Sequence, residues 1–371
     1  MNSPNISKHF LKKSFWNGKK VLVTGHTGFK GSWLTIWLLK LGAEVVGFSL
    51  EEEKNSLFSR LKIKSNIDHN INDIRNRNAL DKVIKFFKPD IVFHLAAQPL
   101  VKIGYSKPLL TWEINLMGTI NLLNCLSELD KNCIAIFATT DKVYKNNEWI
   151  YGYREEDPLG GFDPYSASKA ACEIAISSWR SCHFWDSKYQ DKNLLIASVR
   201  AGNILGGGDW SEFRIMPDII KSLLDKKVIK IRNPYSTRPW QHVLEPLSGY
   251  LSLAKTINDN PDDDKFCSSF NFGPKIESNR QVLELVNCSL KFWEGRYEID
   301  KYETNQKESK LLNLNIDKAY NLLNWSPILS FEKTVEKTIE WYKNVLLEKE
   351  DALKECIKNI QLYQNELTKN N

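Results

Sequence analysis

A tyrosine and a lysine in this sequence have the spacing that places two side chains on one face of a helix. Tyr165 and Lys169 are four positions apart in the segment DPYSASK, and such positions are neighbours on a helix surface. An ammonium beside a phenol favours the phenolate, which can take a proton from an alcohol. Chance supplies about one such pair in a chain of this composition. Tyr297 and Lys301 form a second pair, so the spacing alone does not identify a site.

The position in the chain favours the first pair. Tyr165 follows a predicted strand that ends at Thr140, whereas Tyr297 lies in the less regular C-terminal half, where we interpret it as structural. The strand continues into Asp141 and Lys142, which could serve as acid and base, while the Thr140 hydroxyl could hydrogen-bond the reacting oxygen of a bound molecule. A lysine that acts as a base must be partly neutral near pH 7, which we expect burial and neighbouring cations to cause. A strand-end turn with a solvated lysine remains the alternative.

The segment GHTGFKG joins a short apolar strand, Lys19–Thr24, to an apolar helix, Gly31–Leu41. Its glycines recur at every third position. In this setting the first permits a tight turn, the second lets the backbone approach a diphosphate, and the third lets the helix pack closely on the strand. The free amides at the start of the helix then face the phosphates. The pattern predicts a dinucleotide-binding turn, whose expected cofactor contacts are Gly25, Thr27, Gly28, Phe29 and Gly31.

Further residues are expected along the rest of the dinucleotide. An acid about 20 residues beyond the turn would hold the ribose hydroxyls. Glu51 comes slightly late, and it could equally be the first of three exposed glutamates. No arginine accompanies it to favour a 2′-phosphate, so NAD is favoured over NADP. Asp73, with Ile74 beside it, is a candidate for the adenine amino group. A nicotinamide ring could lie against the backbone of a strand end with small side chains, at Leu95, Ala96 and Ala97.

Several polar side chains are candidates for holding a phosphorylated substrate, since a forked guanidinium suits paired oxygens and an amide can hydrogen-bond them. They are Gln98, Asn203, Arg214 and Arg238. His94 is expected in the core, and the six histidines form no metal-ligand spacing, so no metal site is predicted.

The elements that must position these residues alternate between strands and helices. Such alternation predicts a doubly wound α/β fold, in which helices cover both faces of a parallel sheet and ligands bind beyond the carboxyl ends of its strands. The predicted strands are Lys19–Thr24, Glu44–Leu50, Ile71–Ile74, Asp90–Ala96, Cys133–Thr140 and Leu194–Arg200, and the predicted helices are Gly31–Leu41, Ala79–Phe87, Leu110–Leu129 and Ser166–Phe184. We assign residues 14–205 to a Rossmann-type nucleotide-binding domain and 206–345 mainly to a smaller mixed α/β lobe for the substrate. Residues 346–371 form a charged tail, either an amphipathic helix or a frayed end.

The composition is that of an ordinary globular chain. Of 371 residues, 42% are hydrophobic and 26% charged, and no run approaches the roughly 20 apolar residues of a transmembrane helix. The N-terminus lacks the apolar segment of a secretory signal, and seven scattered cysteines without a C-x-x-C pair favour a reducing cytoplasm over disulfides or zinc. A net charge of +6 suits small anionic ligands and gives little support for nucleic acid as a partner.

Together, the glycine turn, the Leu95–Ala97 segment, Thr140 and the Tyr165/Lys169 pair resemble the extended short-chain dehydrogenase/reductase superfamily. Longer strings, over about Trp16 to Val345, are similar to one family within it, the CDP-glucose 4,6-dehydratases. These strings are GHTGFKGSWL from Gly25, AAQPLV from Ala96, TDKVY from Thr140, DPYSASK from Asp163, RAGNILGGGDW from Arg200 and RPWQHVLEPLSGY from Arg238. The lysine that follows Thr-Asp is informative, since dTDP-glucose dehydratases usually carry glutamate there.

The resemblance implies an internal redox dehydration of CDP-D-glucose to CDP-4-dehydro-6-deoxy-D-glucose. A tightly bound NAD takes hydride from C4 of the sugar and returns it to C6 after water has left across C5 and C6. The implied roles are proton acceptor at O4 for Tyr165, orientation of that oxygen for Thr140, and contact with the nicotinamide ribose for Lys169. Lys142 is then the expected base at C5 and Asp141 the acid at the C6 hydroxyl.

The resemblance also implies a cytoplasmic homodimer, paired through Leu110–Leu129 and Ser166–Phe184, that supplies deoxysugars for surface polysaccharides such as O-antigen. No nucleic acid or membrane partner is expected. Other readings are another nucleotide-sugar dehydratase or a 4-epimerase of the same superfamily, and a non-catalytic dinucleotide-binding protein. An epimerase needs no acid–base pair for elimination, and non-catalytic relatives usually lose the tyrosine and lysine.

Overall fold

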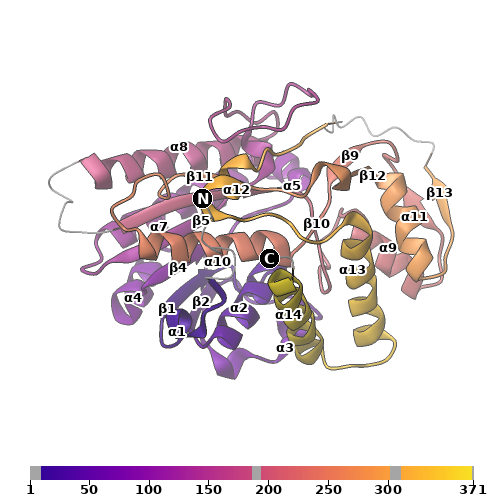
Figure 1. Cartoon of the computed structure of the whole chain (residues 1–371), viewed down its shortest axis with the longest axis horizontal. Helices are drawn as coiled ribbons and strands as arrows, with labels where there is room; N and C mark the ends of the chain where they lie inside the picture. The colour runs from indigo at the N-terminus through magenta and orange to yellow at the C-terminus, as the bar shows by residue number, and fades with distance from the viewer. Residues whose placement is uncertain (1–9, 186–193, 301–310, 370–371) are drawn as a thin grey trace.

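A seven-stranded parallel sheet forms the centre of the molecule (Figure 1), whose computed structural model describes residues 10–185, 194–300 and 311–369. The strand order is β11-β6-β5-β4-β1-β2-β3, and each neighbouring pair is parallel. The strands are β1 Lys20–Thr24, β2 Glu44–Ser49, β3 Asp68–Ile71, β4 Ile91–His94, β5 Cys133–Ala138, β6 Leu194–Ala201 and β11 Ser269–Phe272. The winding reverses between β1 and β4, which confirms the doubly wound α/β prediction and places the ligand-binding edge at the carboxyl ends of these strands.

Both faces of the sheet are buried. Along β1, Val21 and Val23 pack into one core and Leu22 into the other, because successive strand side chains point to opposite faces. The first core lies under α2 Phe29–Leu41, α10 Leu244–Asp259 and α14 Ala352–Lys369, and the second under α4 Arg77–Phe87, α7 Gly118–Ser127 and α8 Pro164–Trp185. A strand that is buried on both faces has a continuous run of apolar residues, and for this reason these strands could be predicted from the sequence.

Two predicted elements differ from the structure. The third strand is Asp68–Ile71 and not Ile71–Ile74, because the true strand is a polar edge strand that an apolar pattern does not reveal. The predicted helix Leu110–Leu129 is divided into α6 Pro108–Trp112, a π-helical turn at Glu113–Met117 and α7.

A group of short elements lies apart from the large sheet, at the right of the view in Figure 1. It contains α9 Ile215–Leu224, α11 Val282–Phe292, the pair β9 Thr237–Pro239 with β12 Asn279–Gln281, and the pair β8 Ile229–Ile231 with β13 Tyr297–Ile299. Between these segments the chain crosses back, since α10 and β11 belong to the large sheet and its cover. The remaining elements are α1 Lys13–Trp16, α3 Leu57–Leu61, α5 Val101–Ser106, α12 Asp317–Leu323, α13 Phe331–Leu346, β7 Ile204–Leu205 and β10 Gln241–His242.

The charged C-terminal tail is a docked helix. α14 packs against α2, α3 and α13, and Figure 1 shows it beside α2. Its Tyr363 is buried and meets the ring of Trp37 edge-on at 5.8 Å. Over the described ranges, no helix has the length and apolar character needed to span a membrane.

Candidate active site

Three of the predicted catalytic side chains meet at the end of β5. After Ala138 the chain leaves the sheet and forms a short 3₁₀ turn at Asp141–Val143. The Thr140 hydroxyl donates to an oxygen of Asp141 at 3.0 Å, and the Lys142 ammonium contacts the same oxygen at 3.1 Å. Asp141 is almost fully buried, whereas 33% of the Lys142 side chain is exposed. Lys142 is therefore in an ion pair at the strand end and remains partly exposed, as the alternative reading also allows, and its role as a base stays a prediction.

The first turn of α8 brings Tyr165 to this group. Its hydroxyl lies close enough to that of Thr140 for the threonine to affect its pKa, and the side chain is buried. Burial raises the pKa of Tyr165 to about 12, with nearby Asp141 acting in the same direction, while Thr140 and Arg214 oppose the shift. The protein groups alone therefore keep this phenol protonated near pH 7.

Lys169 lies one helical turn beyond the tyrosine, as its spacing requires. Its ammonium is buried and donates to the carbonyl of Ala138 at 3.2 Å, so it lies at the end of the same strand. Desolvation lowers the pKa of Lys169. The structure thus brings together all five predicted catalytic side chains, from β5, the following turn and α8.

A buried network behind Lys169 holds α8 against the sheet. Glu173, one turn further along α8, accepts hydrogen bonds from Thr139 and from Ser198, and forms an ion pair with Arg200 at 2.9 Å. Arg200 also donates to the hydroxyl of Tyr144. The side chains of this network are all buried, and they join α8 to β5 and β6. No spacing in the sequence indicates this network, because its members lie on separate elements.

Two buried oxygen atoms beside the cluster have no partner among the described residues. They are Oδ2 of Asp141 and Oδ1 of Asn203. A Cβ added to Gly202 would come within 2.9 Å of the same Asp141 oxygen, so Asn203 follows a residue that touches the acid. Buried polar atoms normally find partners in the protein or in water, and these two are free to contact a ligand.

The glycine turn has the geometry expected of a dinucleotide cradle. Gly25 has φ +75°, and a Cβ there would lie 2.7 Å from the amide nitrogen of Ala96. A Cβ on Gly31 would lie 2.1 Å from the carbonyl oxygen of Gly25, so the helix and the turn are too close for any larger residue. The N-cap of α2 is Gly28, which has no side chain to cap the first amides. These residues fit a bound diphosphate.

The neighbours of the turn fix its position between β2 and β4. The Thr27 hydroxyl contacts that of Ser49 at 2.7 Å and donates to the carbonyl of Leu50 at 2.9 Å. Phe29 is half-buried, against the first core. Next to Ala96, Leu95 and Ala97 complete the end of β4.

The expected adenosine contacts are less clearly formed. Glu51 is exposed, as the alternative reading allowed, and it is the adjacent Glu52 that pairs with Lys64. Asp73 is held by Arg75, whose guanidinium binds both of its oxygens and lowers its pKa. Ile74 is buried against Gly118. Contact of these residues with a cofactor stays a prediction.

Of the residues predicted to hold the substrate, Arg214 lies near Tyr165, whereas Gln98 and Arg238 have contacts within the protein. Arg214, at the N-cap of α9, lies close enough to Tyr165 to influence its charge and pairs with Asp209 at 3.0 Å. Gln98 is buried, and its side-chain amide donates to Thr111 and accepts from a backbone amide, which ties down the loop after β4. Arg238 lies on β9 and donates to a neighbouring carbonyl, so its contact with substrate stays a prediction.

Two further residues, His94 and Tyr297, were interpreted from the sequence as structural. His94 is buried between two threonine hydroxyls, and burial lowers its pKa to about 3, which confirms a core histidine. Tyr297 lies on a short strand with 37% of its surface exposed, and Lys301 lies outside the described residues.

Sequence reasoning missed Lys30, in the first turn of α2. It lies close enough to Asp141 and Lys169 for their charges to affect its pKa. A lysine in the first turn of a helix is unfavourable, because the N-terminal end of the helix dipole is positive, and this position could have drawn attention to it.

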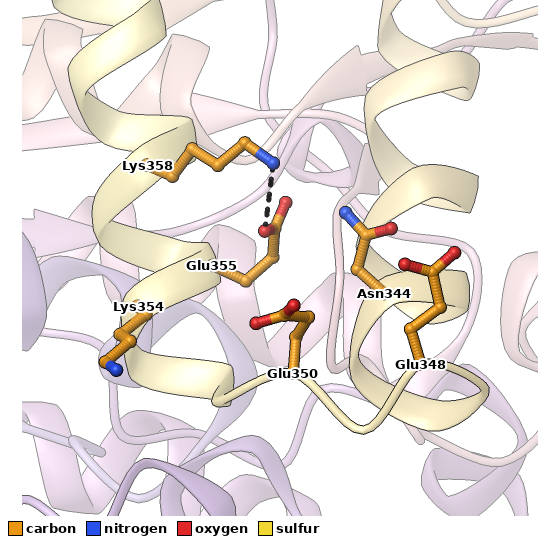
Figure 2. Close-up of a pocket in the computed structure, with 6 residues that line it drawn as sticks. All are labelled: Asn344, Glu348, Glu350, Lys354, Glu355 and Lys358. Atoms are coloured by element: carbon orange, nitrogen blue, oxygen red, sulfur yellow. Dashed lines mark hydrogen bonds and ion pairs between the residues drawn. The ribbon is translucent and has the colours of Figure 1, made fainter.

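A surface hollow lies away from this cluster, where α13 leads into α14 (Figure 2). It has a volume of about 300 Å³ and is lined by Asn344, Glu348, Glu350, Lys354, Glu355 and Lys358. Figure 2 shows Lys358 bonded to Glu355, at 3.3 Å. None of its lining residues belongs to the catalytic cluster, so the hollow does not mark the active site.

Comparison with known proteins agrees with this geometry. Residues 22–338 match the family described as GDP-mannose 4,6 dehydratase. The chain is 42% identical over 336 residues to a CDP-glucose 4,6-dehydratase from Salmonella typhimurium, covering 90% of this chain and 93% of that protein.

Solved structures share the fold. A dTDP-glucose 4,6-dehydratase from Bacillus anthracis in complex with NAD superposes with a TM-score of 0.71 at 20% identity, covering 89% of this chain and 98% of that one. A UDP-glucose 4-epimerase from Thermotoga maritima with UDP-glucose gives a TM-score of 0.72 at 20% identity, covering 88% and 99%. Because dehydratases and epimerases fit the fold equally well, the sequence relationship makes the finer assignment. The chain belongs to the GDP-mannose 4,6 dehydratase family, within the extended short-chain dehydrogenase/reductase superfamily.

Proposed function

We propose that this protein converts CDP-D-glucose into CDP-4-dehydro-6-deoxy-D-glucose in an NAD-dependent dehydration. The observation that carries the proposal is the Asp141–Lys142 pair, which lies directly beside Thr140 and Tyr165. A 4-epimerase needs no acid–base pair for elimination, and a non-catalytic protein needs none of these groups. The relative at 42% identity, a CDP-glucose 4,6-dehydratase, supports the same assignment.

Tyr165 is proposed to accept the proton of the C4 hydroxyl, while the Thr140 hydroxyl orients the oxygen. With a pKa of about 12, Tyr165 needs additional positive charge before it can act as a base near pH 7. When bound at the glycine turn, NAD would supply a cationic nicotinamide ring and the capacity to accept hydride from C4 and give it back at C6. Lys169 adds a second cation and, from its place at the end of β5, is proposed to hold the nicotinamide ribose.

Asp141 and Lys142 are proposed to remove water across C5 and C6. A proton shift across their 3.1 Å contact converts the ion pair into a carboxylic acid and an amine, which are the required forms. Lys142 then takes the proton from C5 while Asp141 protonates the departing C6 hydroxyl through its unpartnered Oδ2. This step releases one water and restores the ion pair.

The proton balance assigns a further task to Thr140. When C6 receives hydride, Lys142 returns its proton to C5, so that Asp141 lacks one proton and Tyr165 holds one more than the phenolate. The Thr140 hydroxyl donates to Asp141 at 3.0 Å and lies close to the Tyr165 hydroxyl. It can therefore pass the proton from Tyr165 to Asp141 and reset the site.

The test is to incubate the purified full chain separately with CDP-glucose, dTDP-glucose and GDP-mannose, with NAD but no reductant, and to read product masses. We expect loss of one water from CDP-glucose alone. Consumption of dTDP-glucose instead would preserve the mechanism and overturn the nucleotide assignment. An unchanged mass with a changed retention time would indicate an epimerase, and no change with any sugar would contradict enzymatic dehydration.

We also propose a cytoplasmic homodimer that serves deoxysugar and O-antigen synthesis. Large apolar side chains are exposed on the helices expected to pair, at Leu109, Met117 and Ile174. Covering them against a second copy would remove apolar surface from water. Light scattering should give twice the chain mass, and Ile174→Glu should give monomers; a monomeric wild-type chain would contradict the proposal.

A further inference from the structure

Thr139 lies between two residues that contact the candidate catalytic side chains of α8. On one side, the carbonyl of Ala138 accepts a hydrogen bond from the Lys169 ammonium at 3.2 Å. On the other side, the hydroxyl of Thr140 lies close to that of Tyr165. Because the backbone links the three residues, a movement of Thr139 would displace both of these contacts at once.

Thr139 is itself joined to α8, one turn beyond the lysine. Its hydroxyl donates to Oε1 of Glu173 at 2.5 Å, with the carbonyl of Val199 as a more distant acceptor at 3.4 Å. Its backbone amide donates to the same carbonyl at 2.9 Å, which holds the residue on β6. Glu173 follows Lys169 by four positions, so the two side chains lie on one face of α8. Thr139 therefore connects β5, β6 and α8 directly beside the reacting groups.

Glu173 has the partners that a buried charge needs. Arg200 of β6 donates to both of its oxygens, from Nε at 3.0 Å and from Nη2 at 2.9 Å. Ser198, also on β6, donates to Oε2 at 2.7 Å. Although burial opposes ionisation, these groups hold the pKa of Glu173 below its ordinary value. A hydrogen bond to an ionised acceptor is stronger than one to a neutral group, so Glu173 is a firm point of attachment for the end of β5.

The reaction makes a strict demand on this attachment. Groups that exchange protons with a substrate must be held in the productive geometry, and a displacement of about 1 Å can cost a hundredfold in rate. We propose that Thr139 and Glu173 are positioning residues, whose hydrogen bond fixes α8 on the end of β5 so that its tyrosine and lysine meet Thr140 in the reactive arrangement. The inference rests on the proposed function, since the chemistry being positioned is the dehydration.

The test compares two hydroxyl donors to the same carboxylate. Thr139→Val removes the donor at the end of β5 and keeps the shape of the side chain. Ser198→Ala is the matched control, because the Ser198 hydroxyl contacts Glu173 and Ser269 and lies on β6, outside the strand that ends at Thr140. In both variants Arg200 still pairs with Glu173, so we expect the two changes to lower Tm by similar amounts.

Turnover should separate the two variants. Thr139→Val should reduce kcat for the dehydration by about tenfold to a hundredfold, with KM for the nucleotide sugar within about twofold of wild type. Ser198→Ala should keep both constants within about twofold of wild type. Thr139→Ser restores the hydroxyl and should recover most of the lost rate. A general loss of stability would affect the valine and alanine variants alike, and it would not give this pattern.

Three results would overturn the proposal: equal losses of kcat in Thr139→Val and Ser198→Ala, wild-type turnover by Thr139→Val, and failure of Thr139→Ser to recover the rate. If Thr139→Val does not fold, Glu173→Asp takes its place. It keeps the charge but shortens the reach towards β5, so wild-type kcat in this variant has the same consequence.

The variants are compared on whichever of the three nucleotide sugars the wild-type chain dehydrates, so a wrong nucleotide assignment does not affect the comparison. A wild-type chain that dehydrates none of them would overturn the proposed function and this inference together. The three results above, obtained with an active wild-type chain, would overturn the inference alone.

Discussion

Two buried polar clusters in this protein differ in how many of their hydrogen-bonding groups have partners. In the candidate catalytic cluster, one oxygen of Asp141 and one of nearby Asn203 have no hydrogen-bond partner among the residues that the structure describes. In the second, which we call the C-terminal latch, Glu245 of α10 accepts the amides of Ile328 and Leu329 with one oxygen and the hydroxyl of Tyr363 with the other.

The latch is completed by two further groups. Ser248 contacts the Tyr363 hydroxyl at 3.0 Å and accepts the indole N–H of Trp325 at 2.8 Å. A network whose donors and acceptors are all paired has no group left to bind a ligand, and it makes the surrounding packing more rigid. A network with unpaired buried groups lowers stability until a ligand pairs with them. The difference distinguishes the candidate active site, which has free polar atoms, from a network that holds α14 against α10.

The largest effect should come from Tyr165→Phe. Without the phenol oxygen there is no acceptor for the C4 hydroxyl proton, and we expect turnover to fall about a thousandfold or more. Tyr297→Phe removes the other tyrosine with a lysine four residues on and should leave turnover unchanged. The measurement is the initial rate of CDP-glucose consumption. Equal losses in both variants would undo the choice between the two pairs.

Lys142→Met should separate oxidation from elimination. The base at C5 is removed, and elimination should slow by roughly a hundredfold to ten-thousandfold, while NAD binding is retained. Reduced nicotinamide should then accumulate on mixing with CDP-glucose, visible by its ultraviolet absorbance. Normal turnover by this variant would remove Lys142 from the mechanism.

Tyr363→Phe tests the latch in the opposite sense. One oxygen of buried Glu245 loses its donor, which should lower the free energy of unfolding by about 1–3 kcal/mol and reduce Tm by several degrees. The turnover number at a temperature well below Tm should not change. A fall in turnover without a fall in Tm would mean that the latch belongs to the active site.

The smallest effect concerns pH. Burial raises the pKa of Glu245 from its ordinary 4.5 to about 7 in the folded chain. The folded state thus holds a proton that the unfolded state has lost, so this stabilising contribution is present at low pH and disappears as the pH rises through 7. Between about pH 6 and pH 8 it should diminish by roughly 1 kcal/mol. Tm of wild type, compared with Glu245→Gln, should show this extra decline, and parallel curves would contradict it.

The sequence by itself determined the doubly wound fold, and it predicted the dinucleotide turn and the five candidate catalytic residues, whose roles rest on the family resemblance. Each depends on local spacing: continuous apolar strands, glycines at every third position, Tyr165 and Lys169 at helical spacing, and a polar triplet directly after a strand. Short-range backbone geometry fixes such features, and they can be recognised without knowing what lies opposite.

Only the tertiary structure decided which charges meet. The Glu173–Arg200 pair joins α8 to β6, the latch joins α10 to the C-terminal helix, and Lys30 faces groups from elements far along the chain. The third strand was predicted at the wrong residues for a related reason: the polar residues of β3 form a strand because they pair with β2, and no apolar pattern marks them. Burial and charge pairing are sums over neighbours brought together by folding, so no spacing in the sequence could report them.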